Sequence, residues 1–111
     1  MLDKVKKILT ERILLDSEDY YNIEKYREKL IKILSLDKEI TINILQQLNK
    51  VQVLYASEVF EEISANLNSY DYFNCLILLE KKFPDINIKI SIEEAKKFMH
   101  WMKRLFMIWL E

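Results

Sequence analysis

The pattern of apolar and polar positions predicts helices along most of the chain, and the longest of them lies in its middle. Between residues 41 and 67 the apolar side chains recur at spacings of three and four, as on one face of a helix. They are Ile44, Leu48, Val51 and Tyr55, and, on a face rotated by roughly a quarter-turn, Val59, Phe60, Ile63 and Leu67. We therefore expect one long central helix that bends near Ala56 and Ser57, or whose two halves are covered by different neighbours.

Shorter helices are expected on both sides of the central one. Their predicted ranges are 2–15, 18–35, 70–83 and 91–110. Asp16 and Ser17 offer a stop and a new N-cap for the second of these helices, and Asp37 or Thr41 begins the central one. Pro84 ends the helix that starts near residue 70. Ser91 and Glu94 have the spacing of a capping box, which predicts the start of the last helix.

Residues 85–91 break the helical pattern. Ile86, Ile88 and Ile90 alternate there with polar residues, which is the spacing of a strand. An isolated strand is not stable in water, so we interpret this stretch as an extended linker whose three isoleucines pack into the core. A strand that pairs with another chain is the alternative.

Composition agrees with a helical fold. The 111 residues are 50% hydrophobic and contain no glycine, which leaves enough apolar surface for a core but makes tight hairpin turns hard to build. A chain of this length is expected to form one domain. We therefore predict an all-α fold, a compact single-domain bundle of about five helices over residues 1–111 with one long central helix.

The sequence also carries expectations about location. The first sixteen residues have charges among their apolar positions and no small-residue cleavage site, unlike a signal peptide. No apolar run is long enough to span a membrane. The single cysteine, Cys75, cannot form an intramolecular disulfide and fits a reducing compartment. We expect a cytoplasmic protein that does not associate with membranes.

The sequence offers few residues that could support catalysis. Cys75 and His100 are the only cysteine and the only histidine, so three or four zinc ligands of these types cannot be assembled. Cys75 lies in the apolar run FNCLILL, where a buried and inert thiol is expected. We predict no enzyme activity, no metal site and no cofactor.

Charge disfavours direct binding of nucleic acid. The pI is about 5.9 and the net charge is −1, whereas a phosphate-binding surface is strongly basic. Short basic clusters do occur, but acidic residues are interleaved with them. They are Lys4, Lys6 and Lys7; Lys81 and Lys82; Lys96 and Lys97; and Lys103 and Arg104. We expect each cluster to be a solvated helix face.

One segment stands out by its charge. The thirty residues between Lys50 and Lys81 contain no basic residue and five acidic ones. Tyrosines lie in or beside this segment, and carboxylates that steer a basic partner next to tyrosines that anchor it make an effective protein interface. We call the predicted contact the acidic surface; it consists of Tyr55, Glu58, Glu61, Glu62, Tyr70, Asp71 and Tyr72.

The leading functional hypothesis is a small inhibitor of bacterial or phage origin, of the immunity or antitoxin kind. It would neutralise one basic protein, such as a toxin nuclease, by covering that protein's substrate-binding face with the acidic surface. This class follows from size and charge distribution. The oligomeric state and the identity of the partner do not follow from the sequence.

The alternative hypothesis rests on the C-terminal stretch. Residues 91–110, SIEEAKKFMHWMKRLFMIWL, resemble the closing helix of the small α-helical subunit of type III CRISPR effector complexes. The residues that carry the resemblance are Ala95, Trp101, Met102, Lys103, Arg104 and Phe106. The resemblance implies a subunit of a nucleoprotein assembly in which Lys96, Lys97, Lys103 and Arg104 face nucleic acid.

Overall fold

Helices account for most of residues 1–97, which are the part of the chain that the computed structural model describes, and no strand occurs there. The helices are α1 (Leu2–Ile13), α2 (Tyr20–Leu34), α3 (Lys38–Gln46), α4 (Lys50–Ala56), the short 3₁₀ helix η1 (Ser57–Val59), α5 (Phe60–Leu67) and α6 (Tyr70–Lys82). A further helical stretch begins at residue 89 and continues to the last described residue, 97. The predicted all-α, compact fold is confirmed.

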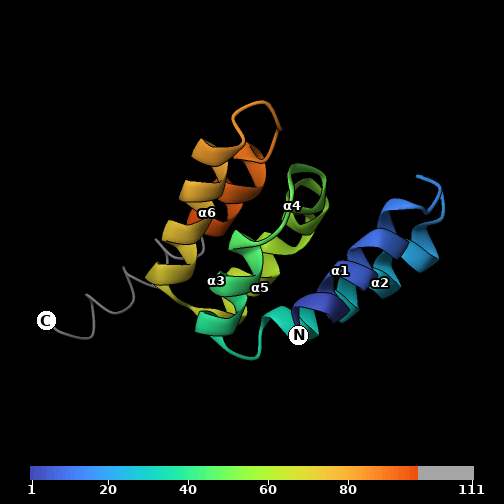
Figure 1. Ribbon diagram of the computed structural model, residues 1–111, viewed down its shortest axis with the longest axis horizontal. Coiled ribbons are helices and arrows are strands. Elements are labelled where there is room, and N and C mark those ends of the chain that lie inside the picture. The colour runs from blue at the N-terminus through green and yellow to red at the C-terminus, as the bar shows by residue number, and fades with distance from the viewer. Residues whose placement is uncertain (98–111) are drawn as a thin grey trace, which may run out of the picture.

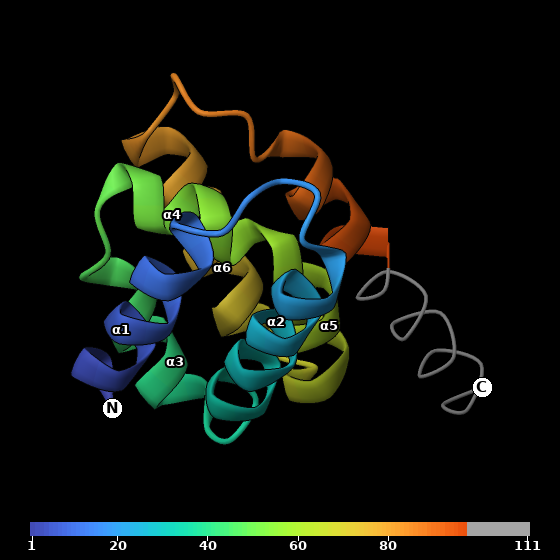
Figure 2. The same ribbon diagram turned by 90° about the vertical axis from the view of Figure 1, so that its right-hand side faces the viewer.

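The helices are arranged around a shared core. The antiparallel pair α1 and α2 lies on one side and α6 on the other, with α3, α4 and α5 between them (Figures 1 and 2). Helix α1 packs against α2 and α4, and α3 packs against α6. The largest fully buried side chains include Leu9 of α1, Leu34 of α2, Phe60 of α5 and Tyr72 of α6, so the core draws on every layer.

The central helix is shorter than predicted. It is interrupted at residues 47–49, where Asn49 caps α4 and forms a reciprocal capping box with Gln52. The interruption resets the helical phase, so Val51 is 49% exposed and Val53 is fully buried instead. From residue 50 to 67, α4, η1 and α5 form one joined helix of 18 residues. A 3₁₀ turn, η1, lies at the place where a bend or a change of neighbours was expected.

Side-chain caps set most of the other helix starts. Asp19, rather than Ser17, accepts a hydrogen bond from the Asn22 backbone N–H and begins α2 two residues later than expected. Asp37 caps α3 and Ser69 caps α6 in the same way. Between α5 and α6, Asn68 adopts the left-handed conformation, which takes the place of the glycine that usually ends a helix.

The linker interpretation of the isoleucine stretch holds for two of its three isoleucines. Ile88 is fully buried and Ile86 packs partly against the core, but Ile90 is 66% exposed. The reason is that the helix begins at residue 89, so Ile90 follows helical rather than extended spacing. The capping box at Ser91 is therefore wrong: the Ile92 N–H already bonds to the Ile88 carbonyl at 3.1 Å. Residues 98–110 of the predicted last helix lie outside the described residues.

Candidate partner-binding surface

Glu58, the first acid of the predicted acidic surface, belongs to an ion cluster that joins three helices. The Arg12 guanidinium of α1 binds it with two hydrogen bonds, Nε to Oε1 at 2.9 Å and Nη2 to Oε2 at 2.8 Å. The Arg27 Nη2 of α2 donates to Oε2 at 2.7 Å. Because Glu58 lies in η1, the cluster ties the α1–α2 pair to the central helix. We call Arg12, Arg27 and Glu58 the ion triad.

The environment of the ion triad holds Glu58 in its charged form. Burial alone would raise the pKa of Glu58, but the hydrogen bonds and the positive charges of Arg12 and Arg27 together outweigh it and leave the pKa below its usual value. Tyr55 covers the other side of the triad, with the Arg12 guanidinium carbon 5.0 Å from the centre of its ring. Both residues are thus engaged in contacts within the chain and only partly exposed, and their contact with a partner stays a prediction.

Tyr70 and Tyr72 of the predicted surface differ in their exposure to solvent. Tyr72 is fully buried, and its hydroxyl donates to the Phe60 carbonyl at 3.0 Å, so the expectation that it faces a partner is wrong. Burial raises its pKa above the usual tyrosine range. Tyr70, two residues earlier at the start of α6, is 56% exposed. Its neighbour Asp71 is also exposed, but its carboxylate lies 3.5 Å from the Lys38 ammonium.

Glu61 and Glu62 are the acids of the predicted surface that remain exposed without an ion pair within residues 1–97. They lie in the first turn of α5, whereas Tyr70 and Asp71 lie at the start of α6. The predicted acidic surface is therefore divided into two small exposed patches and an engaged interior portion.

Exposed tyrosines beside carboxylates without ion pairs also occur at a place that the sequence did not lead us to expect. In the turn between α1 and α2 and at the start of α2, Leu14 is 80%, Tyr20 is 74% and Tyr21 is 81% exposed. Asp16 and Glu18 are exposed beside them and form no ion pair with any residue of the described chain. We call Leu14, Asp16, Glu18, Tyr20 and Tyr21 the acidic turn.

A signal for the acidic turn was present in the sequence. No basic residue occurs between Arg12 and Lys25, and four acids lie in that interval together with two adjacent tyrosines. This interval is shorter than the one between Lys50 and Lys81, so it is a weaker signal of charge asymmetry. Its tyrosines, Tyr20 and Tyr21, are nevertheless more exposed than Tyr70, which also lies at the start of a helix.

The residues considered for chemistry are Cys75 and His100. Cys75 is buried, as expected, and burial raises its pKa to about 11, which keeps the thiol protonated at neutral pH. His100 lies outside the described residues. Within the described residues, no group of three metal-binding side chains gathers in one place, and no helix has the length and apolar character needed to cross a membrane.

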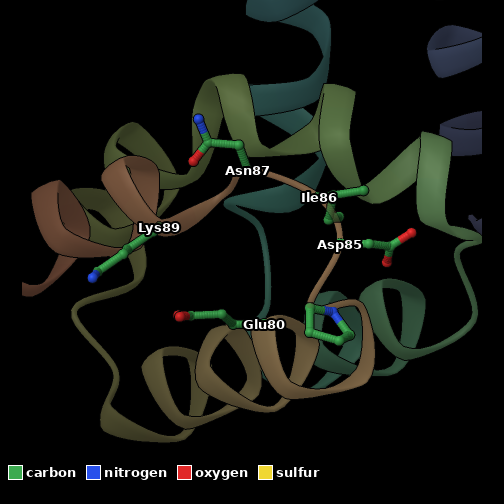
Figure 3. Close-up of a pocket in the computed structure, with 6 residues that line it drawn as sticks. Glu80, Asp85, Ile86, Asn87 and Lys89 are labelled. Carbon is green, nitrogen blue, oxygen red and sulfur yellow. The ribbon is translucent and has the colours of Figure 1, made fainter.

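A hollow of about 390 Å³ lies beneath the linker between α6 and the last helical stretch. Its polar side chains do not converge on one point. Figure 3 shows Glu80 and Lys89 extending to one side while Asp85 points to the other, where it pairs with Lys50 of α4. That ion pair lowers the pKa of Asp85 and fastens the linker, so we assign the hollow no chemical role.

The comparisons with known proteins assign no family. No family model, no curated protein and no solved structure matches this chain. Among the residues that carry the resemblance to the type III CRISPR subunit, Ala95 is buried, and Trp101, Met102, Lys103, Arg104 and Phe106 lie outside the described residues. The surfaces with a described geometry are those of residues 1–97.

Proposed function

We propose that this chain is a non-enzymatic binding protein of the immunity or antitoxin kind that neutralises one basic protein partner. The observation that carries the proposal is the acidic turn, where Tyr20 and Tyr21 are 74% and 81% exposed next to carboxylates without cationic partners in the described chain. Large apolar surface left in water is favourable to bury on association, and tyrosine is enriched among the residues that dominate binding energy.

The arrangement of the acidic turn suits a basic partner. Asp16 and Glu18 extend the negative potential into solvent, which speeds the encounter with a positively charged protein. The turn itself is held by hydrogen bonds: the Asp16 side chain accepts from the Glu18 N–H at 2.9 Å, and the Asp16 carbonyl accepts from the Asp19 N–H at 3.0 Å. A pre-ordered turn loses less conformational entropy on binding than a flexible loop.

The experiment compares two candidate contacts in one affinity capture from the source organism's lysate, with and without nuclease. The tagged full chain is used as wild type, as Tyr20→Ala/Tyr21→Ala for the acidic turn, and as Glu61→Lys/Glu62→Lys for the exposed part of the predicted surface. Glu39→Lys/Glu93→Lys is the control with the same change in charge, because both glutamates are exposed and lie in other helical segments. Glu58 is left intact, since its loss would disrupt the ion triad.

The proposal expects one basic protein that survives nuclease treatment and is retained by wild type and control. Its loss from the tyrosine variant assigns the contact to the acidic turn, and its loss from the Glu61/Glu62 variant assigns it to α5. Retention by both variants contradicts the acidic contact. Several proteins with RNA that disappear after nuclease treatment would favour the nucleoprotein-subunit alternative.

A further inference from the structure

Helices α1 and α2 also form a groove of about 490 Å³ that the proposed function does not use. Lys4 and Lys7 line it from α1, and Lys29 and Lys32 line it from α2. Because the two helices run antiparallel, as Figures 1 and 2 show, these lysines lie at the end of the pair away from the acidic turn. We call this feature the basic groove.

The basic groove has apolar residues between its two rows of lysines. Ile8 of α1 and Ile33 of α2 are among its lining residues. Ile8 is 7% exposed and Ile33 is half-buried, whereas all four lysines are exposed. The floor of the groove is thus apolar, with Ile33 as its more accessible isoleucine, and positive charge lies on both of its sides.

The positive charge of the groove is not neutralised within the described chain. None of its four lysines forms an ion pair with a carboxylate of residues 1–97. Lys29 lies 4.9 Å from the centre of the Tyr26 ring, which is an interaction that keeps its charge. Glu11 is the one acid in the lining, and its nearby carboxylate raises the pKa of Tyr26.

We propose that the basic groove binds an acidic amphipathic helix of another protein. A helix that carries an apolar stripe between rows of Glu or Asp would place its stripe on Ile8 and Ile33 and its carboxylates near the lysines. Such helices dock through residues at i, i+3, i+4 and i+7 into grooves between two helices. Complementary charge on both edges fixes orientation and accelerates association.

Nucleic acid and a membrane fit the same surface less well. A phosphate backbone has no apolar stripe to place on the isoleucines, and the chain as a whole has a net charge of −1, which opposes binding beyond the groove itself. A bilayer surface is flat, whereas these lysines line a concavity. The acidic turn at the other end of the same helix pair would also be repelled by anionic lipid.

The test uses the full ¹⁵N-labelled chain and a fluorescein-labelled helical peptide of about 15 residues, with leucines at i, i+4, i+7 and i+11 flanked by glutamates. A second peptide replaces every Glu by Gln. Binding of the Glu peptide is expected to shift the amide signals of residues 4–11 and 29–33 and to weaken as salt rises. In Lys4→Glu/Lys32→Glu, where two attractions become repulsions, the affinity should fall about tenfold or more.

The matched control is Lys81→Glu/Lys96→Glu, which makes the same change in net charge at exposed lysines outside the groove and should alter the affinity less than about twofold. The proposal is overturned by equal effects of the two variants, by equal binding of the Gln peptide, or by no signal change at millimolar peptide. Tighter, groove-dependent binding of a single-stranded RNA of about 15 nucleotides, or of phosphatidylserine vesicles, would overturn it in favour of that ligand. The acidic turn is unchanged in every variant, so this outcome is independent of the proposed function.

Discussion

The segment from Tyr55 to Tyr72 and the α1–α2 pair differ in how many of their charged and aromatic residues are engaged within the chain. In the first, Glu58 is held by two arginines, Tyr55 lies on Arg12, and Tyr72 is in the core. In the second, the outward lysines and the acids of the turn have no ionic partner within the described residues. The comparison shows that a local excess of one charge in a sequence does not reveal which charges remain available to a partner.

The contrast has a simple physical origin. A carboxylate that faces the interior must be paired or hydrogen-bonded, because an isolated buried charge costs several kcal/mol. Its partners come from helices far away in the chain: Arg12 precedes Glu58 by 46 residues. Lysines at the edge of a helix pair face no such requirement, since water solvates them.

The largest expected effect separates the two neighbouring tyrosines. Tyr72→Ala removes a fully buried ring and should lower the free energy of unfolding by about 3–5 kcal/mol. Tyr70→Ala removes a ring that is 56% exposed and should change it by less than about 0.5 kcal/mol. Urea unfolding followed by circular dichroism measures both.

Tyr72→Phe keeps that measurement informative if Tyr72→Ala does not fold. It removes only the hydroxyl that donates to the Phe60 carbonyl and should cost about 1–2 kcal/mol. Equal stability losses for the alanine variants at positions 70 and 72 would show that Tyr72 is not a core residue in solution.

The second prediction concerns the ion triad. Glu58→Gln keeps the shape of the side chain but leaves Arg12, whose side chain is 9% exposed, without a counter-charge. The expected loss is about 2–3 kcal/mol, below the value for a fully buried pair because the Arg27 side chain is 36% exposed and screened by water. The control is Glu61→Gln, an exposed neighbour that should change the urea midpoint little. Similar midpoints for the two variants would contradict a structural role of the triad.

The third prediction concerns how the difference in stability between wild type and Glu58→Gln depends on pH. The pKa of Glu58 is lowered in the folded chain, so its stabilisation is fully present above the unfolded value of about 4.3. It disappears as the pH falls through the lower folded pKa. The urea midpoints of wild type and Glu58→Gln should therefore differ most between pH 6 and 7 and converge toward pH 3. A difference that stays constant with pH would mean that the triad acts through packing and not through charge.

The helices themselves could be predicted from the sequence to a large extent. Helical spacing predicts a helix from residue 70, where α6 begins, and Asp37, one of the two predicted starts of the central helix, caps α3. The break before α4 could also have been found, because Asn49 and Gln52 have the spacing of a capping box. The periodicity of residues 41–67 does not reveal this break, because the apolar residues before and after it share the same three- and four-residue helical spacing.

The candidate sites were less predictable. Helical spacing cannot tell whether Tyr72 or Tyr70 faces the core, because that depends on which side of α6 meets α3 and α5. The pairing of Glu58 with Arg12 and Arg27 depends on how α1 and α2 are placed against η1, and no local pattern encodes that. The basic groove likewise arises only when lysines of two helices are brought together, although each pair alone resembles a solvated face.

The smallest expected effect tests whether the lysines of the basic groove contribute to the fold. Lys4 and Lys7, and likewise Lys29 and Lys32, are three residues apart on one helix, where like charges repel by a few tenths of a kcal/mol. Lys4→Glu/Lys32→Glu should therefore leave stability unchanged or raise it by about 0.3–0.5 kcal/mol, as urea midpoints of the variant and of Lys81→Glu/Lys96→Glu would show. A decrease of more than about 1 kcal/mol in the free energy of unfolding would mean that these lysines, like the ion triad, hold the helices together. Any loss of peptide binding in the variant would then reflect damage to the fold. An unchanged or raised midpoint together with weakened binding would instead mean that the groove carries unneutralised charge for a partner and that folding alone does not account for it.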